Sequence, residues 1–180
     1  MGKASDKEKL SPEFQAKEFA CKATLLVLGT AFELVSKHSP ELREEIAGWR
    51  PGLTFSMGIM PNGPYMTVKR EGDLVKYLGW GLQNPDITIL FKNFDAAMLA
   101  FTAQIGNHTA VAQKRFIVQG NVGETVKIAR ALNMVQSYLF PSILFEKLFK
   151  RPPEFTTAQL WAKAKVMAGL TPGLLLNALK

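Results

Sequence analysis

A short apolar strand that stops at a glycine and leads directly into a helix constrains this chain more than any other feature. Residues 116–118 (Phe-Ile-Val) are β-prone, and Gly120 ends the run. Asn121 can accept a hydrogen bond from the first free N–H groups of a helix, whose dipole favours Glu124 in its first turn. The helix is expected to face the sheet with one apolar stripe, formed by Val122, Val126, Ala129, Leu132 or Asn133, and Val135 or Gln136. This junction indicates an α+β domain.

Upstream, apolar residues recur at every second position, which is typical of strands with one buried face. Leu53, Phe55 and Met57 show this alternation, and Glu71-Gly72-Asp73 is a typical hairpin turn. Five strands are expected, at residues 53–59, 65–70, 74–80, 87–91 and 114–119. The first three should form an antiparallel meander. We therefore expect an α+β fold with a five-stranded, mostly antiparallel sheet covered on one face by helices.

Two start signals predict the N-terminal helices. In Ser11-Pro12-Glu13, the serine is expected to be the N-cap and the proline to lie at the first position of a long helix that should run to about Lys37. Ser39-Pro40-Glu41 repeats the signal for a shorter helix that ends near Gly48. Residues 1–10 precede the first signal and are expected to be a flexible N-terminus. Residues 11–151 should then form one domain, with its core at 53–141.

Residues 152–180 are expected to form a helical appendage. Pro152-Pro153 makes a stiff joint, and Thr156 or Thr157 can cap the helix that follows. Leu160 and Trp161 begin its apolar face. Gly169 and Thr171-Pro172-Gly173 should interrupt this helix before a last apolar turn. The appendage could act as a mobile lid, a fixed cover or a dimer contact.

Composition suits an apolar interior and a reducing compartment. Of the 180 residues 47% are hydrophobic, and the chain has 12 Phe against 3 Tyr and 3 Trp. Phenylalanine has no polar group to satisfy when it is buried. Cys21 is the single cysteine and cannot form an internal disulfide, so we expect a reduced, buried thiol and a cytoplasmic location.

Candidate catalytic groups are sparse. His38 follows a helix end and His108 lies in a predicted loop, so one Cys and two isolated His do not supply a metal-binding cluster. Residues 120–125 join a strand to a helix but lack the Lys-Ser/Thr of a phosphate loop, and Glu124 would repel an anion. We predict no catalytic residue, no metal, no cofactor and no enzymatic activity.

The net charge of +7 includes two adjacent basic pairs, Lys69-Arg70 and Lys114-Arg115. Because no ring of stacking aromatic residues accompanies them, they are expected to favour anionic membrane surfaces over nucleic acid. The alternative is an ordinary solvated surface.

The segment from Asp86 to Pro141 resembles the sterol carrier protein type 2 (SCP2) sterol-binding domain. The resemblance rests on Asp86-Ile87-Thr88-Ile89, Phe94-Asp95, Lys114-Arg115-Phe116-Ile117-Val118, Gly120-Asn121 and Tyr138-Leu139-Phe140-Pro141. The expected order of helices and strands over residues 53–141 also agrees. The helices expected at residues 40–49 and after Pro141 are additions to the minimal domain.

The resemblance implies a non-enzymatic carrier of fatty acyl chains, sterols or phospholipids, held in an apolar tunnel between sheet and helices. The expected lining is Ile89, Phe91, Met98, Phe101, Ile105, Phe116, Val118, Val135 and Leu139, with Leu160 and Trp161 from the appendage. Transient contact with an anionic membrane and a homodimer through the C-terminal helix are the expected partnerships. The alternative is an accessory protein-interaction module that uses the same fold.

Overall fold

A computed structural model describes residues 12–81, 84–101, 114–139 and 157–178, and every structural statement below refers to these. The expectations for residues 1–10, for Ile105 and His108, and for the joint at 152–153 lie outside the described residues, as does the domain boundary at 151. The side chain of Phe101 is also outside them.

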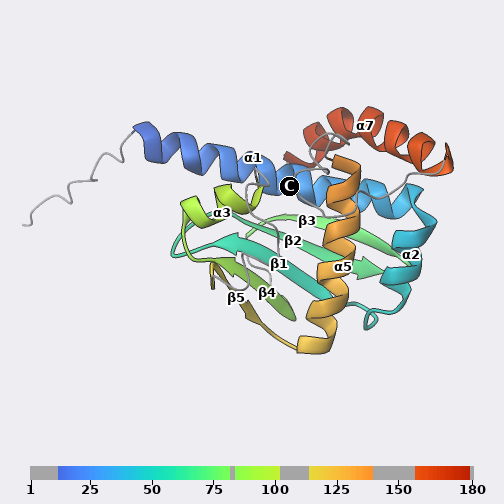
Figure 1. The fold of residues 1–180 in the computed structure, drawn as a ribbon, viewed down its shortest axis with the longest axis horizontal. Coiled ribbons are helices and arrows are strands. Elements are labelled where there is room, and N and C mark those ends of the chain that lie inside the picture. The colour runs from blue at the N-terminus through green and yellow to red at the C-terminus, as the bar shows by residue number, and fades with distance from the viewer. Residues whose placement is uncertain (1–11, 82–83, 102–113, 140–156, 179–180) are drawn as a thin grey trace, which may run out of the picture.

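The strands form one five-stranded sheet in the order β3-β2-β1-β4-β5 (Figure 1). Their bounds are Thr54–Ile59 (β1), Tyr65–Glu71 (β2), Leu74–Trp80 (β3), Ile87–Phe91 (β4) and Phe116–Gln119 (β5). β1 and β4 are parallel, and the other neighbours are antiparallel. The predicted α+β fold with a mostly antiparallel sheet is confirmed.

The helix-facing side of the sheet is apolar and continuous across its central strands. Phe55 and Met57 of β1 pair with Ile87 and Ile89 of β4, and all four are buried. The sequence predicted one buried face for β1, but its opposite face is buried as well. There, the hydroxyl oxygens of Ser56 and Thr67 lie 2.5 Å apart across the β1–β2 pair, with both residues fully buried. The Thr67 hydroxyl donates to the Gly81 carbonyl oxygen at 2.7 Å, so these buried hydroxyl groups are hydrogen-bonded within the fold.

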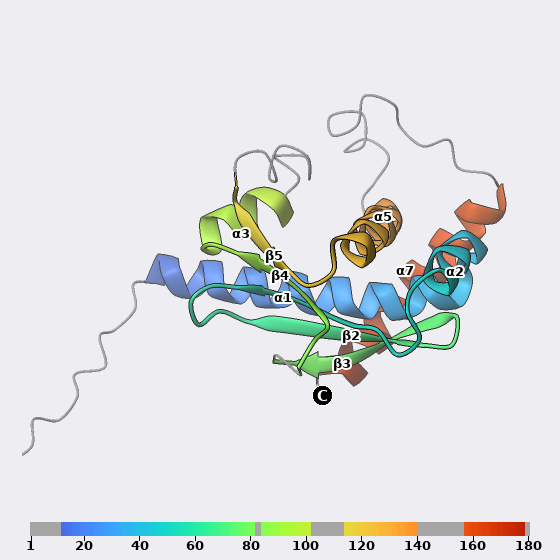
Figure 2. The ribbon, with the colours of Figure 1, turned by 90° about the horizontal axis from the view of Figure 1, so that it is seen from below.

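Helix α1 (Pro12–His38) crosses the sheet and is the central helix of the helical layer (Figure 1). In Figure 2, β2 and β3 lie on one side of α1 and α5 (Val122–Leu139) lies on the other. The buried side chains of α1 include Cys21, Leu25, Leu28, Phe32 and Val35. Gly29 faces the Tyr77 ring so closely that a Cβ there would overlap it. A glycine at this position lets α1 pack directly against β3.

The remaining helices are α2 (Pro40–Ala47), α3 (Phe94–Phe101) and α7 (Thr157–Ala178). Ser39 is the N-cap of α2, because its hydroxyl oxygen accepts a hydrogen bond from the Leu42 amide at 3.2 Å. Asn121 caps α5 in the same way, through the Glu124 amide at 3.1 Å. The cap residues predicted from sequence for α2 and α5 are confirmed.

The buried face of α5 agrees with the predicted stripe at Leu132 and Val135 and differs from it in the first turns. Val122 and Val126 are exposed, and the buried side chains are Ile128, Ala131, Leu132, Val135 and Tyr138. The first turns of α5 pack beside α2 through polar contacts: Lys127 Nζ donates to the Gly48 carbonyl oxygen at 2.7 Å, and Arg130 forms an ion pair with Glu45. These contacts turn the valines of the first turns toward solvent.

Helix α7 is continuous, so the predicted interruption at Gly169 and Pro172 is wrong. Proline removes one backbone hydrogen bond, but packing can compensate for this loss. Gly173 lies against Thr30 of α1, and the buried Asn177 donates a side-chain hydrogen bond to the Thr30 hydroxyl at 3.2 Å. These contacts hold the last turns of α7 on α1, over which the helix curves (Figure 1).

Asp86 joins the start of β4 to β1 and gives a prediction for acid stability. Its Oδ2 accepts hydrogen bonds from the Thr54 amide and the Thr54 hydroxyl, both at 2.9 Å, and Arg50 forms an ion pair with it. The Thr54 amide, followed by its hydroxyl and Arg50, holds the pKa of Asp86 below its usual value. The folded state therefore gains stability from Asp86 above its unfolded pKa of about 3.9, and loses it as the pH falls through the lower folded pKa.

We expect Asp86→Asn to lower the free energy of unfolding by about 1 kcal/mol at pH 7, since the site is partly exposed. Urea unfolding at a series of pH values should show the difference from wild type shrinking below about pH 4. Asp73→Asn, in the exposed β2–β3 turn, is the control and should change little. A deficit for Asp86→Asn that does not change with pH would contradict the carboxylate's role.

Candidate ligand-binding pocket

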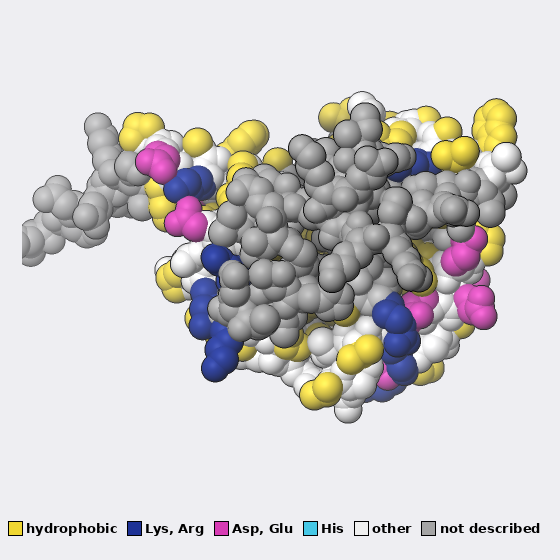
Figure 3. All heavy atoms as spheres, viewed as in Figure 1, with side chains coloured by type: hydrophobic (Ala, Val, Ile, Leu, Met, Phe, Trp, Pro, Cys, Tyr) yellow, Lys and Arg dark blue, Asp and Glu magenta, His cyan; other side chains and the backbone are white. Residues whose placement is uncertain are grey.

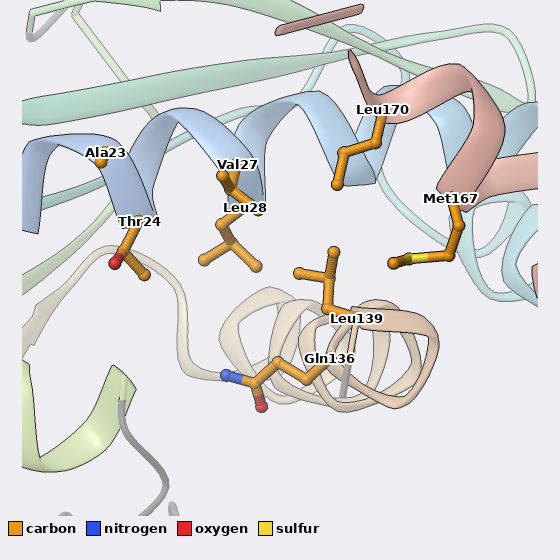
Figure 4. A pocket seen from close by; sticks show the side chains of 8 residues that line it. All are labelled: Ala23, Thr24, Val27, Leu28, Gln136, Leu139, Met167 and Leu170. Atoms are coloured by element: carbon orange, nitrogen blue, oxygen red, sulfur yellow. The ribbon is translucent and has the colours of Figure 1, made fainter. Parts of the chain in front are cut away.

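An apolar pocket of about 330 Å³ lies where α1, α5 and α7 meet (Figure 4). Helix α1 contributes four side chains and α5 and α7 contribute two each: Ala23, Thr24, Val27, Leu28, Gln136, Leu139, Met167 and Leu170. Six of these eight are apolar and none is charged. A pocket with this lining suits hydrocarbon.

Helical spacing explains how these side chains come together. Residues at i, i+1, i+4 and i+5 of α1 share one face, and residues three apart do so on α5 and on α7. In Figure 4, Val27, Leu139, Met167 and Leu170 point into one space. Three helices that are distant in sequence therefore each contribute part of one wall.

The two polar groups lie at the end of the pocket away from Met167 and Leu170 (Figure 4). The Thr24 hydroxyl donates to the Ala20 carbonyl oxygen at 2.9 Å, which leaves its oxygen able to accept a hydrogen bond. The Gln136 amide contains both donor and acceptor atoms. An amphipathic ligand could therefore bind with its polar group at this end and its hydrocarbon toward α7.

The pocket opens to solvent beside α7. Leu28 is buried at the base, whereas Met167 lines the pocket and is still 49% exposed. Lys163, one turn before Met167, donates to the Ser137 carbonyl oxygen of α5 at 3.2 Å, and burial lowers the pKa of its ammonium group. This contact ties α7 to α5 next to the opening.

The residues predicted to line a tunnel lie in several different places. Ile89, Phe91 and Val135 are buried in the hydrophobic core, Met98 packs against it, and the rings of Phe91 and Phe116 are in edge contact at 5.9 Å. Val118, Leu160 and Trp161 are exposed. Among the predicted residues with described side chains, Leu139 lines the pocket between the three helices and the others do not. A tunnel between sheet and helices stays a prediction.

Sequence reasoning missed the α1 wall of the pocket. Leu25 and Leu28 are apolar, and so are Leu26 and Val27 between them. This part of α1 is therefore apolar on more than the face that packs on the sheet. Among the described helices, α1 alone is long and apolar enough to cross a membrane by length and composition, with half of its apolar window buried in the fold. The wide apolar surface of α1 was the signal in the sequence that this helix has a second contact surface.

Reactive groups do not gather at the pocket. Within the described residues, no group of three or more His, Cys, Asp or Glu side chains is placed to hold a metal ion. Cys21 is fully buried, and this burial raises its pKa to about 11. A thiol with this pKa stays protonated near neutral pH and is a poor nucleophile.

The two basic pairs, Lys69-Arg70 and Lys114-Arg115, lie in different parts of the sheet, the first on β2 and the second before β5. Arg70 donates to the carbonyl oxygens of Trp49 and Gly72, so its guanidinium already binds the backbone. Lys114 and Arg115 lie before the edge strand β5, where they line a shallow pocket of about 500 Å³ with Lys92. The four residues therefore do not form one continuous surface.

No protein-family model and no curated protein matches this sequence. Solved structures do resemble it. One is a conserved hypothetical protein of Thermus thermophilus, described as a possible sterol carrier protein, with a TM-score of 0.45 and 12% identity over 61% of this chain and 80% of that one. The chain is similar to sterol carrier protein domains.

Two further structures show the same likeness. Sterol carrier protein domain 2 of Helicoverpa armigera has a TM-score of 0.40 and 18% identity over 74% of this chain and 94% of that domain. A ubiquinone synthesis protein described as UbiJ-SCP2 has a TM-score of 0.43 and 12% identity, over 67% of this chain and 98% of that one.

Proposed function

We propose that this protein binds the hydrocarbon part of a lipid in the pocket between α1, α5 and α7, and that it does so without catalysis. The observation that carries the proposal is the lining of the pocket. Six of its eight side chains are apolar and none is charged, and the pocket has a volume of about 330 Å³. Transfer of that lipid between membranes is the activity we expect to follow from binding. A cytoplasmic location is part of the proposal, supported by the lone, buried thiol of Cys21.

The size of the pocket favours one acyl chain. Small-molecule sites usually measure about 300–1,000 Å³, so this pocket is at the lower end of that range. A fatty acid fits such a space better than a sterol or a two-chain phospholipid. Thr24 and Gln136 would meet the carboxyl end, because they are the polar side chains of the lining.

Organic extraction of the purified protein, followed by mass spectrometry, tests the proposal directly. A fatty acid in near-stoichiometric amount is the expected result. Titration of the extracted protein with a fluorescent fatty acid should then show saturable binding at one site. Absence of both a bound lipid and saturable binding would reject lipid binding as the function.

A bulky side chain in the pocket should abolish binding. We expect Ala23→Phe to weaken fluorescent fatty-acid binding at least about tenfold, since excluding two methylene groups from an apolar site costs about 1.6 kcal/mol. Ala129→Phe, on the exposed side of α5, makes the same change away from the pocket and is the control. Equal binding by the two variants would show that the ligand lies elsewhere.

One observation favours the alternative of an accessory protein-interaction module: α7 exposes several large apolar side chains. A protein that carries no lipid, together with a specific protein complex lost on changing Trp161, would support that alternative.

A further inference from the structure

The outward face of α7 is apolar, the reverse of what a solvated surface helix shows. Trp161 is 72% exposed and Leu175 is 70% exposed, and Leu160, Met167 and Leu176 are also exposed. Ala164 and Ala168 lie between them at helical spacing. Figure 3 shows hydrophobic side chains gathered over α7. We call the exposed side chains of Leu160, Trp161, Met167, Leu175 and Leu176 the α7 apolar face.

The charges of α7 are two lysines and no carboxylate. Lys163 and Lys165 project on the two flanks of the helix, because Lys163 lies about 100° of helical rotation before Ala164 and Lys165 lies about 60° beyond Ala168. An apolar face bordered by lysines is the pattern of helices that lie in a membrane interface, where the ammonium groups reach the lipid head groups.

The opposite face of α7 is fixed to the protein. Ala162, Val166 and Asn177 are buried, and Gly169 and Gly173 pack against Leu34 and Thr30 of α1. The helix therefore presents its apolar face without having to leave its place. Trp161 is well suited to a membrane interface, since its ring is large and apolar and its N–H can bond to polar head groups.

We propose that the α7 apolar face docks onto an anionic lipid surface and brings the pocket opening at Met167 to that surface. The link to the pocket rests on the proposed function, whereas docking itself does not. Charge complementarity selects the partner: the exposed Lys165 and the net charge of +7 attract anionic head groups. In a symmetric dimer through this face, two helices that carry lysines and no carboxylate would face each other, and their like charges would repel.

Vesicle co-sedimentation of the full chain tests docking. We expect binding to equimolar phosphatidylcholine–phosphatidylglycerol vesicles, weak binding to phosphatidylcholine alone, and weaker binding at high salt. The double variant Trp161→Ser/Leu175→Ser should bind at least about tenfold more weakly. Phe19→Ser/Val122→Ser removes equally exposed apolar side chains from α1 and α5 and should bind like wild type.

Single lysine changes test the charge. Lys165→Gln should weaken binding to the anionic vesicles about fivefold, while Lys69→Gln, on β2, should not. Equal losses for both double variants, or for both lysine variants, would overturn docking through α7. So would a concentration-dependent dimer in analytical ultracentrifugation that disappears in Trp161→Ser/Leu175→Ser without any vesicle binding.

Fatty-acid titration of the same samples separates the two proposals. Vesicle binding by a protein that takes up no fatty acid rejects the proposed function and supports docking. Saturable fatty-acid binding by a protein that ignores anionic vesicles overturns docking alone. Ala23→Phe should still sediment with anionic vesicles, because Ala23 lies inside the pocket and not on the α7 apolar face.

Discussion

Phe32→Ala should lower the free energy of unfolding by about 3–5 kcal/mol, the largest effect we expect from a single substitution. Phe32 is completely buried at the contact between α1 and the sheet. Its ring meets that of Phe55 edge to face, with centroids 5.6 Å apart. The substitution would leave a cavity between the two layers, and the neighbouring side chains can fill such a cavity only in part.

Phe19→Ala is the matched control, because Phe19 lies on the same helix and is 73% exposed. It should change stability by less than about 0.5 kcal/mol. Urea unfolding followed by circular dichroism measures both variants. Similar losses for the two would mean that helix propensity, and not burial against the sheet, controls the stability of α1.

Gly120→Ala should lower the free energy of unfolding by about 3 kcal/mol, for two reasons that act together. Gly120 has a φ of +122°, which L-residues with a side chain rarely adopt. A Cβ there would also lie 2.6 Å from the Asp86 carbonyl oxygen, at the point where β4 begins. Any relief of this overlap must move β4 or the junction between β5 and α5.

Gly72→Ala separates the two reasons. Gly72 has a φ of +68° in the β2–β3 turn, and a Cβ there would meet nothing within 4 Å. Gly72→Ala should lower the free energy of unfolding by only about 1 kcal/mol, which is the cost of the backbone conformation alone. If both variants lost the same stability in urea unfolding, the close approach to Asp86 would have no energetic consequence.

Helix α1 connects the core to the candidate pocket because it is apolar on two sides. Leu25 and Phe32 pack in the core, while Ala23 and Val27 line the pocket. Leu28 belongs to both sets. A substitution on α1 can therefore affect stability, ligand binding or both, depending on the side of the helix it changes.

Local signals in the sequence were sufficient for most of the fold. The alternation in residues 53–59 and the hairpin turn at Gly72 predicted strands that the structure contains. Ser39 and Asn121 were predicted as helix caps, and both accept the expected hydrogen bond. These features depend on interactions within a few residues, so a sequence read in order reveals them.

The same local signals did not predict most of the residues that line the pocket. Periodicity shows that one face of a helix is apolar, but not whether that face packs tightly or borders a space. Phe91 and Val135 were predicted at the ligand and lie in the core, whereas Leu139 lines the pocket. Gln136 and Met167 lie on helix faces that periodicity could predict, but their role at the pocket exists only where α5 and α7 meet α1.

The sequence by itself determined the five strands, the long first helix, and the turn and cap chemistry that connects them. Tertiary structure decided that α7 continues through Pro172, that the first turns of α5 expose Val122 and Val126, and that three helices enclose a pocket. The physical reason is the range of the interactions. Caps, turns and alternation act over a few residues, while the support of α7 by Thr30 joins positions far apart in the chain.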